Sequence, residues 1–208
     1  MEKGTVVTGT DRTGDPADII DHLAGIAPGS ALDAIRARRP EARSQSQASY
    51  LALFEPADPA GITPAERFAV AVFVGGLHGA AEIAAFYRSH LGDSGALIAA
   101  IDAATTEAAG TGPYGRYPAG PLSREDQPGP VYRPGGDVAQ RLGPRLAAAF
   151  AHLHLLVLHP RDADPASLQP LLDAGWSTTD IVTLSQIAAF LPFQIRVVAG
   201  LRVLAGQL

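Results

Sequence analysis

Residues 63–77 read TPAERFAVAVFVGGL and contain the sharpest local signal for a helix in the chain. Thr63 is a typical helix cap, Pro64 fits the first helical position, and Glu66 completes a capping box three residues after the cap. Residues 68–74 then contain no polar side chain. Because a helix without a polar face is stable only when it is buried all round, we expect a central core helix here.

Similar start and stop signals continue on both sides of this helix. Gly75-Gly76 is expected to weaken or kink it, since each glycine costs about 1 kcal/mol relative to alanine. Asp15-Pro16 offers a cap and a first helical position for the N-terminal helix, and Pro192 is expected to break or kink the last one. No segment has the period of a strand, so the predicted fold class is all-α. The remaining helices are expected at about 30–38, 42–54, 77–91, 94–109, 138–158, 165–174 and 177–191, followed by 193–204.

Residues 110–136 interrupt the helical pattern with several glycine–proline pairs and three tyrosines. This segment exceeds the ~12–15 residues usual for a loop in a compact domain, so it is interpreted as a functional lid, an oligomer arm or a disordered stretch. It divides the chain into two helical halves, the second of which starts near Val138 or at Gly143-Pro144. Residues 1–14 are predicted to form a disordered tail, which leaves 15–208 as a single helical domain.

The composition excludes several classes of protein. The chain has 208 residues, of which 47% are hydrophobic and 18% charged, with a net charge of −5 and no cysteine. Without thiols it forms no disulfide, no zinc–thiolate site and no cysteine nucleophile. The absence of a basic patch argues against a nucleic-acid partner. No nucleotide-binding or hydrolase motif is present, so no cofactor is expected.

Neither a metal site nor a membrane segment is predicted. His152 and His154 are two residues apart on a helix and face different directions, so they are poorly placed to share a metal ion. No apolar signal-peptide segment opens the chain. The apolar run at 187–204 contains a proline and two arginines, and charged side chains are costly in hydrocarbon. We therefore expect a cytoplasmic protein without a membrane partner.

Glu66, His78 and Glu82 are the candidate catalytic residues. His78 and Glu82 are four residues apart, so on one helix their side chains would meet, and a break at Gly75-Gly76 would turn Glu66 toward them. A carboxylate–imidazole pair in apolar surroundings is suited to acid–base catalysis. The alternative is that Glu66 only completes the capping box and that His78 and Glu82 form a solvated ion pair.

Arg196 is the candidate ligand-binding residue. It stands in an apolar stretch, and an arginine is seldom buried without a partner. One interpretation is an internal ion pair with Glu66 or Glu82 that holds the two halves together. The other is that Arg196 binds the carboxylate of a ligand at the pocket. The apolar neighbours are Phe190, Leu191, Phe193, Ile195, Val197 and Val198.

Two parts of the chain resemble the AhpD-like alkylhydroperoxidase and carboxymuconolactone decarboxylase superfamily, in its peroxidase-related branch. The first part is TPAERFAVA at 63–71 followed by LHGAA at 77–81. The second runs from DAGWS at 173–177 to IAAFLPFQIR at 187–196. The resemblance implies the helical fold of that family, with Glu66 at the glutamate position. It also implies a homo-oligomer, as a dimer, trimer or hexamer.

The chain departs from this family at the catalytic cysteines. His78 stands at the first cysteine position, Ala81 at the second, and Ala85 at the position of the family's histidine. A thiol peroxidase needs a thiolate nucleophile and a resolving partner, and neither histidine nor alanine supplies one. The resemblance therefore implies a cysteine-less member that is not a thiol peroxidase.

Three functions remain open from the sequence. The first is a non-redox role, in which the protein binds a small carboxylate-bearing or apolar molecule or partners a cysteine-bearing relative. The second is an acid–base enzyme of the decarboxylase type, with His78 as base or acid and Glu66 or Glu82 orienting it. The third is a structural oligomer with a vestigial pocket, because an all-apolar helix also suits a large interface.

Overall fold

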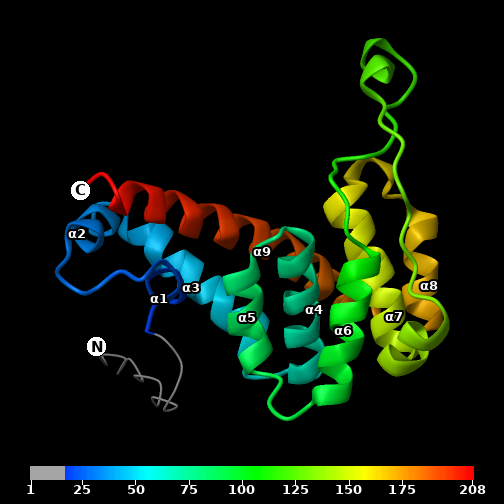
Figure 1. The fold of residues 1–208 in the computed structure, drawn as a ribbon, viewed down its shortest axis with the longest axis horizontal. Helices are drawn as coiled ribbons and strands as arrows, with labels where there is room; N and C mark the ends of the chain where they lie inside the picture. Colours follow the sequence, from blue (N-terminus) through cyan, green and yellow to red (C-terminus); the bar gives the residue numbers. More distant parts are fainter. Residues whose placement is uncertain (1–16) are drawn as a thin grey trace, which may run out of the picture.

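The computed structural model describes residues 17–208, and over that range the protein is all-α, as predicted (Figure 1). The predicted tail at 1–14 and the predicted cap at Asp15-Pro16 lie outside the described residues. The first helix is instead capped by Asp18, whose carboxylate accepts from the backbone N–H of Asp21 at 2.9 Å. The helices are α1 (Ile19–Ala24), α2 (Ala31–Ala37), α3 (Pro40–Phe54), α4 (Pro64–Leu77), α5 (Ala81–Ser89), α6 (Gly95–Glu107), α7 (Gly136–Leu158), α8 (Gln169–Asp173) and α9 (Thr178–Ala205), with 3-10 turns at Pro121–Glu125, Pro160–Asp162 and Pro165–Leu168.

Helix α4 lies at the centre of the fold, as its apolar sequence predicts. It packs against α3, α5, α6, α7 and α9, and residues 69–74 are at most 3% exposed. The predicted capping box is formed, because the Thr63 hydroxyl accepts from the N–H of Glu66 while the Glu66 carboxylate accepts from the N–H of Thr63. Local sequence therefore sets where this helix begins, and the surrounding helices bury it.

The expected break at Gly75-Gly76 does not occur, and α4 continues to Leu77. The glycines serve close packing instead. A Cβ atom at Gly76 would lie 2.4 Å from the Cγ2 atom of Thr105 on α6, and one at Gly75 would lie 3.2 Å from the Cβ atom of Ala84 on α5. The absence of side chains lets α5 and α6 approach the end of α4, so the glycines shape the core without turning the chain.

Helix α9 runs along the molecule as a single element of 28 residues (Figure 1). The expected break at Pro192 does not occur, because the helix passes through that proline. It packs against α1, α2, α3, α4 and α7. Within 17–208 it is the one helix long and apolar enough to cross a membrane by length and composition, and 33% of its most apolar window is buried inside the fold. The core helices of soluble proteins meet the same criterion.

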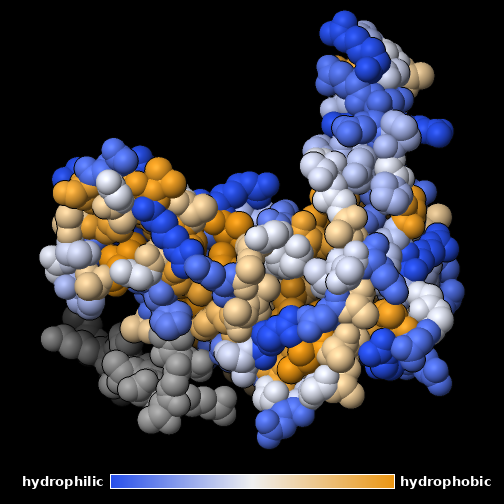
Figure 2. Space-filling view, viewed as in Figure 1, coloured by the Kyte–Doolittle hydropathy of each residue, from blue (hydrophilic) through white to orange (hydrophobic). Residues whose placement is uncertain are grey.

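The segment between α6 and α7 forms an arm that projects from the helical body (Figure 1), and the surface of its outer part is mainly hydrophilic (Figure 2). Gly115 and Gln127 pair as an isolated antiparallel bridge, with N–H to O distances of 2.8 and 3.1 Å. The base of the arm is fixed to the end of α7, where the N–H of Tyr114 donates to the Leu158 carbonyl at 2.6 Å. After the arm, α7 includes Val138 and changes direction at Gly143, whose φ is +74°. Val138 therefore lies in the first segment of this helix, and Gly143-Pro144 marks the kink at which its second segment begins.

Candidate functional site

The junction between α4 and α5 forms a pocket against α9 with a volume of about 390 Å³. The chain turns sharply there, because His78 caps α4 and Gly79 follows with a φ of +65°. Helix α5 begins two residues later without a side-chain cap at Ala80. We call this cavity the junction pocket. It is lined by His78, Gly79, Ala80, Ala81, Glu82 and Ile83 from the junction, and by Ile195, Val198, Ala199 and Arg202 from α9.

His78 is half-buried in the wall of the junction pocket. Its Nε2 atom is buried and has no hydrogen-bond partner among the described residues. Burial lowers the pKa of His78, and the positive charge of Arg196 lowers it further. At neutral pH the imidazole is therefore uncharged, and it offers one donor and one acceptor to a bound molecule.

Glu82 also lines the junction pocket, but it does not pair with His78. Its carboxylate accepts a hydrogen bond from Arg202, which also donates to the Leu23 carbonyl of α1 at 2.7 Å. The four-residue spacing does not bring His78 and Glu82 together as predicted, because the turn at Gly79 separates them into two helices. Glu82 and Arg202 instead form an ion pair at the rim.

Glu66 lies far from the junction pocket. It occupies the first turn of the uninterrupted helix α4, and His78 follows the last turn. Twelve residues of helix separate the two backbones by about 18 Å. The Glu66 carboxylate is held by the capping box and by Arg145 of α7, whose Nε atom donates to Oε1 at 2.8 Å. The predicted meeting of Glu66 with His78 depended on a break that the structure does not contain.

Arg196 is exposed on the flank of α9. Its guanidinium donates to the Pro192 carbonyl of its own helix at 3.1 Å. Within the described part of the chain it forms no ion pair with Glu66 or Glu82, so the expected internal pair is not formed. The apolar neighbours that suggested burial are shared between the core and an uncovered helix surface. What Arg196 contributes to the site is its charge, which acts on the pKa of His78.

The electrostatics of the junction pocket favour a negatively charged group. The first N–H groups of an α-helix have no partner within the helix and carry partial positive charge, and the residues of the first turn of α5 line this cavity. Arg202 and Glu82 both line the pocket and neutralise each other as an ion pair, so the positive side chain that acts on His78 is Arg196. Among residues 17–208, no group of three histidine, aspartate or glutamate side chains is placed to hold a metal ion.

Two residues of this region were not predicted from the sequence. Arg202 reaches the rim from α9, and Arg145 holds Glu66 from α7. Arg145 is 79 positions from Glu66, and Arg202 is 120 from Glu82. No local pattern could have signalled pairs so far apart in the sequence.

Comparisons of the chain with protein-family models, with curated proteins and with solved structures find no match. The resemblance to the AhpD-like superfamily therefore depends on the segments 63–81 and 173–196 alone.

Proposed function

We propose that the protein is a cysteine-less member of the AhpD-like and carboxymuconolactone decarboxylase superfamily that binds a small carboxylate in the junction pocket. In this proposal the chain has the AhpD-like fold, with two helical halves joined by the segment 110–136. Its role is non-redox, because no thiol is available for peroxidase chemistry. The observation that carries the proposal is His78, which lines a cavity of about 390 Å³ and whose buried Nε2 atom has no hydrogen-bond partner among residues 17–208.

The positive charge around the junction pocket supports a carboxylate rather than a neutral ligand. An anion at the first turn of α5 would be stabilised by the helix dipole and by the charge of Arg196. The apolar side chains of Ile83, Ile195 and Val198 would contact the rest of the molecule. A small cavity with few polar groups is typical of ligand sites, in which apolar contact gives affinity and polar contact gives orientation.

The test is binding of fluorobenzoate, a small aromatic carboxylate, followed by ¹⁹F NMR. We expect saturable binding to the natural protein and weaker binding by at least about tenfold in His78→Ala, since a hydrogen bond to a charged group contributes about 1.5–3 kcal/mol. His22→Ala, which removes an exposed imidazole outside the junction pocket, is the matched control and should bind normally. Equal binding by the natural protein and His78→Ala would refute the site.

An acid–base reaction of the decarboxylase type remains a second candidate. What favours it is that burial lowers the pKa of His78, since a neutral imidazole is the form that acts as a general base. Glu66 is too distant to orient this base, and Glu82 is engaged by Arg202. Turnover of 4-carboxymuconolactone that is lost in His78→Gln and retained in Glu66→Gln would favour the enzyme over the binding protein.

A homo-oligomer, with or without a ligand, is the third candidate. Several large apolar side chains of α9 are exposed, including Val182, Phe193 and Val203. Exposed apolar patches mark interaction surfaces more often than single apolar residues do. The molar mass measured by light scattering at low and high protein concentration tests this proposal, and a mass equal to 21.5 kDa throughout would refute it. A cysteine-bearing relative as the partner would be sought by mixing the two chains in the same measurement.

A further inference from the structure

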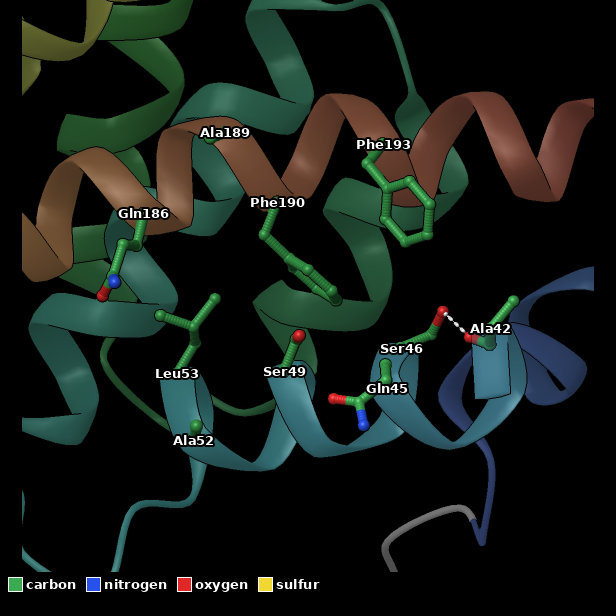
Figure 3. A pocket seen from close by; sticks show the side chains of 10 residues that line it. All are labelled: Ala42, Gln45, Ser46, Ser49, Ala52, Leu53, Gln186, Ala189, Phe190 and Phe193. Carbon is green, nitrogen blue, oxygen red and sulfur yellow. Dashed lines mark hydrogen bonds between the residues drawn. The ribbon is translucent and has the colours of Figure 1, made fainter. Parts of the chain in front are cut away.

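A second cavity lies between α3 and α9, on the other side of the last helix (Figure 3). Its volume is about 590 Å³. The α3 wall consists mainly of small side chains, whereas Phe190 and Phe193 extend toward it from α9 (Figure 3). The lining residues are Ala42, Gln45, Ser46, Ser49, Ala52 and Leu53 from α3, and Gln186, Ala189, Phe190 and Phe193 from α9.

A neighbouring cavity of about 610 Å³ adjoins the first one. The two share Ala42, Ser46 and Phe193, and the second adds Val197 and Leu201 further along α9. We call these two adjoining cavities the α3–α9 groove. From Gln186 to Leu201 the groove follows fifteen residues of helix, or about 22 Å. Such a length suits an extended acyl chain rather than a compact metabolite.

One end of the α3–α9 groove is positively charged. Arg36, Arg38, Arg39 and Arg43 all line that end, and no acidic residue lines either cavity in the described part of the chain. Arg36 and Arg43 are neutralised, because they form ion pairs with Asp18 and Asp21 and, for Arg43, also with Asp33.

Arg38 and Arg39 differ from the other two arginines. Both are exposed, and neither guanidinium forms a hydrogen bond or an ion pair within residues 17–208. They stand at the turn between α2 and α3, at the mouth of the charged end. The opposite end, at Leu53 and Gln186, carries no charge.

The one buried polar side chain of the wall is already hydrogen-bonded within its own helix, and Gln45, Ser49 and Gln186 are exposed. The Ser46 hydroxyl already donates to the Ala42 carbonyl of its own helix at 2.6 Å (Figure 3), and the helical backbones on both sides are satisfied internally. An occupant therefore gains mainly by apolar contact with the two phenylalanines and by one ionic contact at the end. A flexible chain with a single anionic head meets both conditions.

We infer that the α3–α9 groove binds a long-chain carboxylate, with the acyl chain between α3 and α9 and the head group at Arg38 and Arg39. Apolar burial and a charged head act at opposite ends of the groove, so both ends are required for full affinity. The site is separate from the junction pocket. Residues 186, 190, 193 and 197 lie on the face of α9 opposite to residues 195, 198, 199 and 202, given 3.6 residues per turn.

The test uses 11-(dansylamino)undecanoic acid, whose emission shifts to the blue in apolar surroundings, at a concentration below its micellar threshold. We expect saturable binding with one probe per chain. Palmitate should displace the probe and butyrate should not, because each buried methylene group strengthens binding about fourfold. The methyl ester of the probe should bind about tenfold more weakly, since it lacks the charge that the arginines would meet.

Two pairs of variants assign the site. Ser49→Phe fills the groove from α3 and should weaken binding at least about tenfold, whereas Ala48→Phe, an equally exposed neighbour outside the lining, should not. Ala189→Phe blocks the same space from α9, and it replaces Ser49→Phe in the test if that variant alters the fold. R38Q/R39Q should weaken binding of the acid to the level of the ester and leave the ester unchanged. Arg124→Gln, in the arm, is the charge control.

Several outcomes would overturn the inference. One is the absence of saturable binding, and another is equal binding by Ser49→Phe, Ala189→Phe and the natural protein. Sedimentation with phosphatidylglycerol vesicles, without binding of the monomeric probe, would assign the groove to a membrane surface. A change of molar mass in Ser49→Phe, again without probe binding, would assign it to contact between copies of the chain.

Discussion

The guanidinium carbon of Arg145 lies 4.0 Å from the centre of the Trp176 ring, and the indole N–H of Trp176 donates to the backbone carbonyl of Arg145 at 3.0 Å. The two residues thus hold each other by side chain and by backbone. The remaining donors of Arg145 bind the Glu66 carboxylate at 2.8 Å, the Gly61 carbonyl at 2.8 Å and the Gly175 carbonyl at 2.6 Å. This one side chain joins the start of α4, the start of the second segment of α7 and the turn before α9.

Replacing Arg145 with methionine should lower the free energy of unfolding by about 1–3 kcal/mol, because it leaves two carbonyls without their donor and removes the ion pair of the Glu66 carboxylate, which keeps only its Thr63 donors. Arg145→Lys should recover only a small part, since an ammonium lacks the planar fork that reaches three acceptors. Urea unfolding measures the effect. Arg141→Met is the matched control, because its exposed pair with Asp137 contributes only a few tenths of a kcal/mol. Equal midpoints for the two methionine variants would contradict the prediction.

Substituting Gly76 with alanine should destabilise the protein by about 1–3 kcal/mol, although alanine normally favours a helix. The reason is the 2.4 Å approach between the added Cβ atom and the Cγ2 atom of Thr105. Combining Gly76→Ala with Thr105→Ser removes that methyl group and should restore most of the loss. A double-mutant cycle in urea measures the coupling. Gly95→Ala, where the added atom meets nothing within 4 Å, should cost nothing, and additive effects at 76 and 105 would disprove the steric argument.

Acid should weaken the fold before its carboxylates titrate, because of a buried histidine. Burial and the neighbouring His159 ring lower the pKa of His154 from 6.5 to about 4. In the unfolded chain the imidazole of His154 therefore takes up a proton near pH 6.5, whereas in the folded protein it does so only near pH 4. The stabilisation is complete above pH 6.5 and falls as the pH drops through this window, by at most about 3 kcal/mol.

Urea midpoints measured between pH 7.5 and pH 4 test this dependence on acid. His154→Gln should flatten the profile, and His22→Gln, at an exposed position, should leave it unchanged. Burial also lowers the pKa of His78 and of His152, so some slope should persist in His154→Gln. A profile that is level from pH 7 to pH 4.5 in the natural protein would contradict the assignment.

Removing the charge of Arg196 should raise the pKa of His78. That charge adds to burial in lowering the pKa, so Arg196→Gln should move it part of the way back toward 6.5. Imidazole ¹H–¹⁵N correlation spectra recorded across the pH range report the titration directly. Arg161→Gln, on the other side of the fold, is the control. A His78 pKa that is the same in the natural protein and in Arg196→Gln would show that the charge does not reach the ring.

The sequence predicts those features that depend on neighbours in the chain. Thr63, Pro64 and Glu66 lie within four residues of one another, so the capping box and the start of α4 could be predicted and are confirmed. The fate of the Glu66 carboxylate depends on Arg145, which tertiary folding brings to it. The same limit applies to Gly76, because only the position of Thr105 shows that the glycine is needed for close contact.

The candidate site combines features that depend on neighbours in the chain with features that depend on tertiary packing. The turn between His78 and Ala81 is local, yet the helical spacing rule fails across it because Gly79 adopts a positive φ. At Pro192 the sequence predicts a break that the structure does not contain, since this proline is accommodated inside α9. Packing against five other helices stabilises α9 on both sides of the proline. A prediction from local sequence does not include the free energy of this packing.

Because α1, α2 and α3 all pack against α9, the order of synthesis separates these partners in time. The ribosome completes α3 about 150 residues before α9, which at 5–20 residues per second is a delay of roughly 8–30 s. During that interval the surface that α9 will cover stays uncovered in the nascent chain. Helices α1, α2 and α3 are therefore made well before α9 but reach their final packing only after α9 has left the exit tunnel.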